Sequence, residues 1–99
     1  MAISEKAQEF LIQSRIADAE GGDVDALMEL GITYSTGRGG LAVDLVEAHK
    51  WFNLAAVSGC TRGQECRAEI SLEMTAREIA EAQRQARAWL GTSQQRYAA

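Results

Sequence analysis

The first stretch of this sequence that could bind a ligand is glycine-rich: "TGRGG" at residues 36–40. Glycine-rich loops bind phosphate when their backbone amides converge at the N-terminus of a helix that follows a strand. Here the glycines follow a segment with helical spacing, and Asp44 stands where the next helix should begin. A carboxylate at a helix N-terminus takes the position that an anion would need. We therefore predict a turn between two helices.

The second group of chemically active side chains consists of His49, Cys60 and Cys66. His49 is the only histidine, and it falls off the apolar face of its segment, so we expect it on the solvated surface. No further histidine or cysteine stands at metal-ligand spacing, which predicts no metal site and no cofactor. The two cysteines are too close in sequence to close a long loop, so we expect reduced thiols, with Cys66 half-buried.

The third group is a row of carboxylates, Glu65, Glu69 and Glu73, at the i, i+4 spacing of one helix face. A pair of acids can act as general acid and base when a pocket perturbs their pKa values. Without a pocket, such a row is a solvated face, and no serine–histidine–acid set is apparent. We predict no catalytic residue.

Helix start and stop signals divide the chain into five helices that would position these groups. The stops are glycines, which tolerate the left-handed conformation, at Gly21-Gly22, Gly37, Gly59 and Gly91. The starts are capping residues: Ser4, Asp23, Asp44 with Glu47, Thr61 with Gln64, and Thr75 with Glu78. The expected helices are about 4–20, 24–36, 45–58, 62–72 and 76–90, in one domain over 1–91 with a C-terminal tail over 92–99.

Apolar and small residues recur at steps of three and four, which is helical spacing, and no segment alternates as a strand would. The first expected face is Ala7, Phe10, Leu11, Ser14 and Ala17; the third is Leu45, Ala48, Phe52, Ala55 and Ala56, widened by Trp51; the fifth is Ile79, Ala82, Ala86, Trp89 and Leu90. We expect these faces, with both tryptophans, in the core of an all-α fold of antiparallel neighbours.

Composition narrows the class of partner. The chain has 99 residues, a net charge of −4 and 46% hydrophobic residues, as in an ordinary soluble domain. Residues 1–59 carry nine acidic side chains against four basic ones, which argues against nucleic acid. No signal peptide and no membrane-spanning run is recognisable, so we expect a cytoplasmic protein.

The sequence also contains a drifted internal repeat. Gly22 and Gly59 are 37 residues apart, and the face of residues 45–55 recurs 34 residues later as the face of residues 79–89, so the copies have drifted by three residues. A period in this range, made of helix–turn–helix units, is typical of an α-solenoid.

One unit of this repeat resembles the Sel-one-like repeat, a relative of the tetratricopeptide repeat. The ordered matches to that family's pattern are Ala26, Leu30-Gly31, Tyr34, Gly37 and Gly39, Asp44, Ala48, Trp51-Phe52, Ala55-Ala56 and Gly59. The turn "GRGGLAVD" is one residue longer than usual, and the second unit has Arg67-Ala68 and Ser71 in place of Leu-Gly and Tyr. The last helices look similar to the tail of short bacterial proteins of this type. The resemblance implies a short right-handed α–α superhelix.

The resemblance also implies a function, because Sel-one-like proteins mostly act as adaptors that assemble protein complexes. We therefore expect a non-enzymatic interaction module that binds a protein partner through a helix-lined concave face. The expected contact residues are Val24, Met28, Ile32 and Ser35 on the second helix, with Gln64 and Arg67 on the fourth. The stripe Val24, Met28 and Ile32 either packs on the fourth helix or is exposed as a partner site. Replacing Met28 and Ile32 by glutamate should abolish capture of a partner and leave the fold intact.

Two alternatives belong to other classes. The chain could be a structural protein that self-associates, as a homodimer, through the first or the fifth helix. It could also be a weak β-lactam hydrolase, as some cysteine-rich relatives are. Those relatives are secreted and disulfide-linked, an arrangement that Cys60 and Cys66 do not reproduce, so that analogy depends on fold alone.

Overall fold

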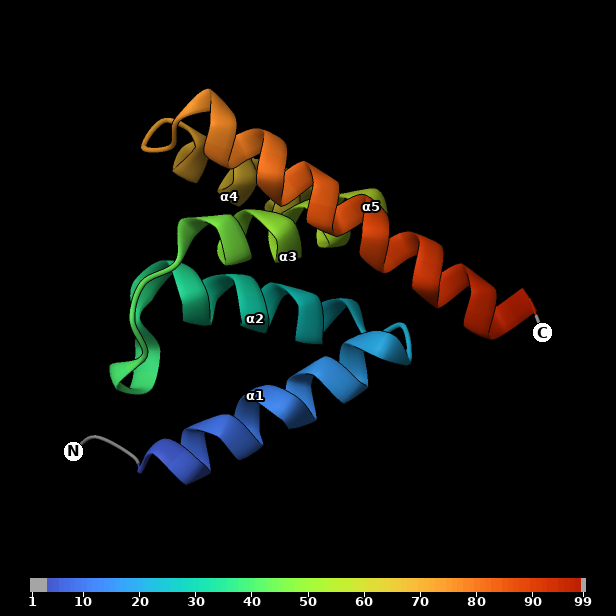
Figure 1. Cartoon of the computed structure of the whole chain (residues 1–99), viewed down its shortest axis with the longest axis horizontal. Coiled ribbons are helices and arrows are strands. Elements are labelled where there is room, and N and C mark those ends of the chain that lie inside the picture. The colour runs from blue at the N-terminus through green and yellow to red at the C-terminus, as the bar shows by residue number, and fades with distance from the viewer. Residues whose placement is uncertain (1–3, 99) are drawn as a thin grey trace.

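The computed structural model describes residues 4–98, and within this range the chain forms helices and no strand. The elements are α1 (Glu5–Glu20), α2 (Val24–Thr36), the short 3-10 helix η1 (Arg38–Gly40), α3 (Leu45–Val57), α4 (Thr61–Ser71) and α5 (Ala76–Ala98). Successive α-helices run in opposite directions (Figure 1). The prediction of an all-α fold with five α-helices is confirmed.

Side-chain caps begin four of the five α-helices where the sequence predicts them. Ser4 Oγ accepts the amide of Ala7, and Asp23 Oδ1 accepts the amides of Asp25 and Ala26. Asp44 and Thr75 cap α3 and α5 in the same way, and α5 has the complete capping box, because Glu78 also accepts the amide of Thr75.

Two helix boundaries differ from the prediction. Thr61 does not cap α4; the N-cap is Cys60, whose backbone is extended and whose side chain makes no capping bond, so Thr61 is already inside the helix. Gly91 does not end α5, which continues to Ala98, so the helix occupies positions 92–98 where a tail was expected. Gly91 keeps a negative φ, and a helical glycine costs only about 1 kcal/mol relative to alanine, so the helix tolerates it.

The other predicted stops are left-handed glycines, as expected. Gly22, Gly37 and Gly59 all have positive φ, and Gly37 ends α2 by donating its amide to the carbonyl of Thr33. The glycine-rich stretch is a turn: Gly39 and Gly40 also have positive φ, and the chain reaches Asp44, which caps α3. The predicted turn is confirmed.

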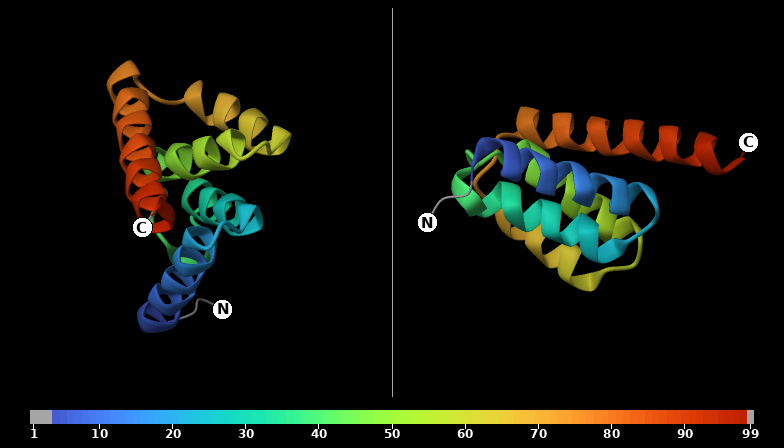
Figure 2. Two further views of the ribbon diagram at one scale, coloured as in Figure 1. Left: turned by 90° about the vertical axis from the view of Figure 1, so that its right-hand side faces the viewer. Right: turned by 90° about the horizontal axis from the view of Figure 1, so that it is seen from below.

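Helix α3 is the centre of the fold, because α2, α4 and α5 all pack against it, whereas α1 packs against α2 (Figure 2). The predicted packed faces of α3 and α5 are confirmed. Their most buried members are Ala48, Trp51, Phe52, Ala55, Ala82 and Ala86, each no more than 2% exposed. Trp51 and Trp89 meet edge to face, with ring centroids 4.9 Å apart, so both tryptophans serve the packing.

Two glycines let the neighbouring helices approach α3 closely. A Cβ atom on Gly31 of α2 would lie 2.4 Å from the Phe52 ring. A Cβ atom on Gly63 of α4 would lie 3.0 Å from the Cβ of Ala55 and from the backbone nitrogen of Ala56. Both positions are buried. Glycines of α2 and α4 therefore let these helices approach α3 on two sides, one against the Phe52 ring and the other against Ala55 and Ala56.

The predicted packed face of α1 is wrong. The helix turns Ile12, Ile16 and Ala19 toward α2, while Phe10 is 72% exposed and Leu11 is 46% exposed. Helix α1 carries two apolar stripes on opposite sides, and its sequence alone does not decide between them. The tight Gly21-Gly22 turn, together with a bond from Gln8 to the η1 backbone, fixes the rotation of the helix.

The second helix pair does not copy the first. Helices α2 and α3 pack along each other, but α4 and α5 diverge from their connecting turn, and each packs on α3 (Figure 2, left). Small apolar positions of α3 face both of them, so α3 serves as the common support.

Candidate functional site

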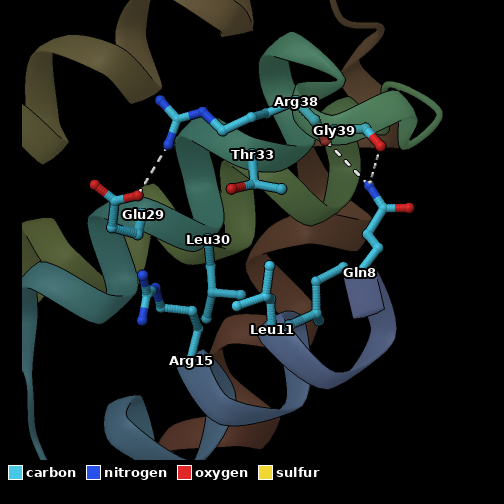
Figure 3. A pocket seen from close by; sticks show the side chains of 9 residues that line it. Gln8, Leu11, Arg15, Glu29, Leu30, Thr33, Arg38 and Gly39 are labelled. Atoms are coloured by element: carbon cyan, nitrogen blue, oxygen red, sulfur yellow. Dashed lines mark hydrogen bonds and ion pairs between the residues drawn. The ribbon is translucent and has the colours of Figure 1, made fainter. Parts of the chain in front are cut away.

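The best-formed concavity lies between α1 and α2 and is closed at one end by η1 (Figure 3). Its volume is about 120 Å³. Helix α1 contributes Gln8, Leu11, Ile12 and Arg15, α2 contributes Glu29, Leu30 and Thr33, and η1 contributes Arg38 and Gly39. We call this the α1–α2 pocket. It exists because α1 packs on α2 through its isoleucine side and leaves Leu11 at the edge of the contact.

The end of the pocket is built by a side-chain amide. Gln8 Nε2 donates to the carbonyl oxygens of Arg38 and Gly39, each at 3.1 Å (Figure 3). These carbonyls belong to the turn after α2 and have no place in a regular helix, so the amide satisfies them and ties the turn to α1. The glycine-rich turn therefore helps to shape a pocket even though it does not cradle a ligand with its own amides.

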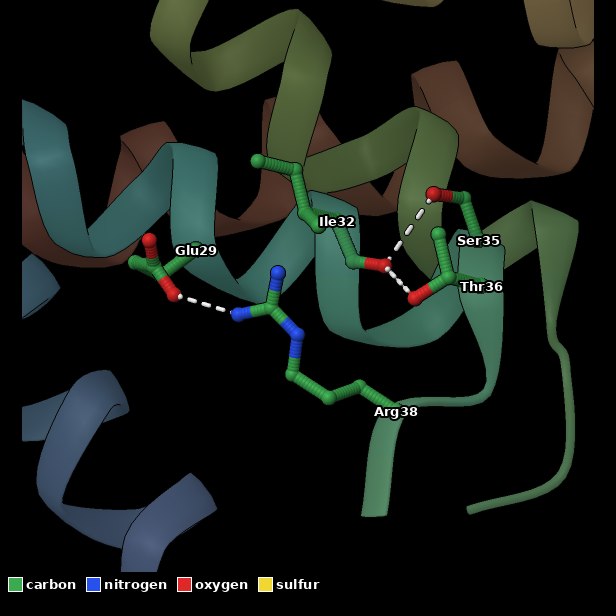
Figure 4. Close-up of polar contacts among 5 residues, drawn as sticks. All are labelled: Glu29, Ile32, Ser35, Thr36 and Arg38. Atoms are coloured by element: carbon green, nitrogen blue, oxygen red, sulfur yellow. Dashed lines mark hydrogen bonds and ion pairs between the residues drawn. The ribbon is translucent and has the colours of Figure 1, made fainter. Parts of the chain in front are cut away.

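The rim of the pocket carries three charges. Arg38 Nη1 pairs with Glu29 Oε2 at 3.0 Å, and both side chains are about half exposed (Figure 4). Arg15 also lines the pocket, and its guanidinium is in no ion pair within the part of the chain whose side chains are described. The rim therefore offers one unpaired cation to an incoming group.

The floor and one wall of the pocket are aliphatic. Leu30 is 1% exposed and forms the floor, Ile12 is half-buried beside it, and the exposed Leu11 forms a wall. An apolar cavity of roughly 150 Å³ can take up a benzene-sized molecule, so the α1–α2 pocket has room for one bulky side chain. Thr33 is the only hydroxyl group in the lining, and the described lining contains no histidine or cysteine. The arrangement can bind an apolar group that has an anionic group beside it. Its lining residues do not combine a general acid, a general base and a nucleophile as a catalytic site would.

The residues expected to form the interaction face lie differently. Met28 is only 8% exposed, and Val24 and Ile32 are half-buried against the core cluster. A glutamate at position 28 would bury a charge, so we expect such a variant to lose stability rather than keep its fold. The Ser35 hydroxyl donates to the carbonyl oxygen of Ile32, which also accepts a bond from Thr36, so Ser35 is already hydrogen-bonded (Figure 4).

The two expected contact residues on α4 are not equivalent. Gln64 is exposed. Arg67 is half-buried, and its Nη1 donates to Oδ1 of Asn53 on α3. Arg67 is therefore engaged inside the protein, which leaves Gln64 as the one freely accessible side chain of the six.

His49 is buried, so the expectation of a surface histidine is wrong. The side chain is 2% exposed on α3, and Nδ1 has no hydrogen-bond partner among the described residues. Burial lowers the pKa of His49, and the nearby positive charge of Arg67 lowers the pKa further, while the polar group of the residue's own backbone opposes this shift. The folded protein therefore holds this imidazole neutral. The sequence does not show this burial, because it results from α2, α4 and α5 packing on more than one side of α3.

The burial of His49 predicts a pH-dependent stability. In the unfolded chain its pKa is near 6.5, so below that pH the unfolded state takes up a proton that the folded state resists. The free energy of unfolding should therefore fall as the pH drops from 7.5 to 5.5, by at most about 1.4 kcal/mol from this residue. His49→Leu removes the titration and the unpaired nitrogen, so its stability at pH 7.5 should be equal or higher.

Urea unfolding of both proteins at pH 7.5, 6.5 and 5.5 checks this prediction. The slope of stability with pH should be smaller in His49→Leu than in the unaltered protein, because carboxylates common to both titrate mostly lower. Equal slopes would contradict a buried, neutral His49.

The cysteines and carboxylates offer no reactive centre in the described range. Cys60 and Cys66 are both free thiols and both half-buried, as predicted for Cys66. Burial raises the pKa of the Cys66 thiol, so little thiolate is present at neutral pH. Among the residues described, no three histidine, cysteine, aspartate or glutamate side chains gather as metal ligands.

Within the described residues, none of the helices combines the length and the apolar character needed to cross a lipid bilayer.

Comparison with known proteins assigns no function to this site, because no family model, no curated protein and no solved structure matches the chain.

Proposed function

We propose that this protein is a non-enzymatic protein-interaction module, and that the α1–α2 pocket receives one apolar side chain of a helical segment of its partner. The observation that carries the proposal is the placement of Leu11. It stands 46% exposed at the wall of an apolar pocket whose floor, Leu30, is fully buried. An aliphatic floor and wall below a charged rim can receive an apolar side chain and pair with a charged group beside it.

The charges of the pocket specify the partner further. Arg15 is the unpaired cation at the rim, while Arg38 is neutralised by Glu29. A carboxylate beside the inserted side chain would pair with Arg15, and a guanidinium can hold it with two hydrogen bonds. The proposed partner segment is therefore an amphipathic helix with an aliphatic or aromatic anchor and an acidic residue about one turn away.

The Sel-one-like resemblance of residues 26–59 is part of this proposal, with the short right-handed superhelix and the adaptor role that it implies. The resemblance is supported by the burial of residues that match the family's pattern. Leu30 and Gly31 of α2 are buried, as are Phe52 and Ala55 of α3. Gly31, which has no side chain, lies against the Phe52 ring. We move the proposed contact face from the α2 stripe to the α1–α2 pocket because Met28 belongs to the core.

A displayed library of 16-residue helical peptides tests the proposal with a defined probe. Selection on the immobilised protein should enrich peptides with a bulky apolar residue and an acidic residue three or four positions apart. Leu11→Glu should weaken binding of a selected peptide at least tenfold, because it puts a carboxylate at the apolar wall. Arg15→Gln should weaken the same peptide several-fold, and less at high salt.

The matched control is Val57→Glu. Val57 is an apolar residue, 61% exposed, at the end of α3 and outside the pocket lining, so this variant should bind the peptide as the unaltered protein does. Equal loss in Leu11→Glu and Val57→Glu, or no loss in either, would contradict the proposed site.

A further inference from the structure

A buried polar cluster lies where α4 packs on α3. His49 of α3 is 2% exposed, and its Nδ1 atom has no hydrogen-bond partner among the described residues. Asn53 follows His49 by four residues, one helical turn, so both lie on the same side of α3. Asn53 Oδ1 accepts a hydrogen bond from Nη1 of Arg67 on α4. An imidazole, an amide and a guanidinium therefore gather at one contact between two helices.

The charges around His49 are unbalanced. Arg67 is the charged side chain that acts on His49, and no carboxylate among the described residues offsets it. Arg67 itself is in no ion pair within that range. Charged and titratable groups of α2, of α5 and of α3 itself are engaged elsewhere: Glu29 with Arg38, Tyr34 with Glu47 and Asp44, Glu81 with Arg84, and Glu47 with Lys50. An imidazolium at position 49 would thus meet a guanidinium and no counter-charge, away from water.

Helix α4 is the most weakly attached of the helices that pack on α3. It makes no other extensive contact with a helix (Figure 2, left). Its only buried residue is Gly63, which lets the α4 backbone lie against Ala55 and Ala56. Cys66 and Ile70 pack against the core but are only half-buried. A helix that buries so little apolar surface opens more readily than the core.

We propose that His49 is an acid-sensitive switch for α4: when the imidazole takes up a proton, α4 separates from α3 while the other helices stay packed. Separation gives the imidazolium access to water and moves it away from Arg67. The contacts of α2 and α5 with α3 do not depend on α4, and the turn after α4 holds no buried anchor, since Leu72 is 90% exposed. Separation uncovers the strip of α3 at Ala55 and Ala56 that Gly63 covers at neutral pH.

The pH range of the switch follows from the direction of the pKa change. Burial and Arg67 hold the pKa of His49 below its usual value of about 6.5, and opening of α4 restores that value. Above this pH both states are neutral. Below it the open state takes up a proton that the closed state resists, so opening becomes more favourable. Between pH 7.5 and 5.5 the equilibrium constant for opening should rise about tenfold.

Native-state hydrogen exchange of the full chain at pH 7.5 and 5.5, corrected for intrinsic exchange rates, tests the inference. The α4 amides from Glu65 to Ile70 should open more often than those of α3 at both pH values. Their opening constant should rise about tenfold on acidification. His49→Leu should abolish this rise. The imidazole NMR signal of the only histidine in the chain should report a pKa below 6.5 in the folded protein.

The role of the neighbouring charge is tested with two arginine variants on α4. Arg67→Met should reduce the acid-induced rise, because His49 can then be protonated in place with less repulsion. Arg62→Met, a matched change of an exposed arginine on the same helix, should leave the rise unchanged. Exchange of α4 only through global unfolding, a local opening that is equal at both pH values, or a rise that persists in His49→Leu would each overturn the inference. The α1–α2 pocket has no lining residue from α3 or α4, so peptide binding tests the proposed function separately.

Discussion

Replacing Gly31 by alanine is expected to destabilise the fold by about 2 kcal/mol, although alanine is the better helix former by about 1 kcal/mol. The added Cβ atom would lie 2.4 Å from the ring of Phe52, which is 2% exposed and cannot move aside without displacing its neighbours. Helices α2 and α3 would have to separate at this contact. Urea unfolding monitored by far-UV circular dichroism measures the loss.

The chain offers a matched control for this prediction in Gly91. This glycine also lies inside a helix, α5, but a Cβ atom there would meet nothing within 4 Å. Gly91→Ala should therefore stabilise the protein by up to about 1 kcal/mol. Combining Gly31→Ala with Phe52→Leu should cost less than the sum of the two single changes, because the smaller side chain makes room for the methyl group. A stabilising Gly31→Ala would show that α2 and α3 are not in such close contact.

Trp51→Ala is the second large-effect prediction, with an expected cost of about 3–5 kcal/mol. Trp51 is 2% exposed, meets Trp89 edge to face, and donates from Nε1 to Glu47 at 3.1 Å. Lys50 lies over the same ring, with Nζ 4.6 Å from the centroid, and also pairs with Glu47 at 2.8 Å. A domain of this size has a total stability of about 5–15 kcal/mol, so this variant should be near the limit of folding.

The comparison variant is Trp89→Ala, which removes the other ring of the pair. Trp89 is only half-buried, so its loss should cost clearly less than that of Trp51. Thermal unfolding of both variants beside the unaltered protein distinguishes them. A Trp51→Ala protein with nearly unchanged Tm, or one more stable than Trp89→Ala, would contradict the central place of α3.

Much of the fold follows from local signals that act within a few residues. Capping side chains at Ser4, Asp23, Asp44 and Thr75 and the left-handed glycines mark nearly all helix boundaries, because both effects depend on the backbone immediately beside them. The face of α5 could be predicted because this helix has one apolar stripe. The face of α3 was predicted in part, because Leu54 and His49 are buried as well.

The missed features are those that depend on distant parts of the chain. Helix α1 has two apolar sides, and which of them is buried depends on the turn at Gly21 and on contacts with α2. His49 looked exposed because it falls off the apolar face that the sequence predicts for α3. Its burial comes from helices that pack on α3 from several directions. The end of α5 was missed because a helical glycine is a weak stop signal when no turn follows it.

The candidate site likewise has one part that local signals predict and one that they do not. The turn at the glycine-rich stretch could be predicted from the sequence. The hydrogen bonds from Gln8, about 30 residues earlier, to the carbonyls of this turn could not, although they shape the pocket. A pocket of this kind arises from the relative rotation of two helices. The apolar stripe expected on α2 is present, but its residues pack in or against the core and do not form a contact face.

The most direct test of the proposed interaction site is an amide NMR titration of the labelled protein with a peptide from the selection. The account predicts that the largest shift changes fall on the α1–α2 pocket, at Gln8, Leu11, Arg15, Thr33 and Gly39. Shift changes centred instead on Ile32, Ser35, Gln64 and Arg67, with the α1 signals unmoved, would contradict it and return the contact face to α2 and α4.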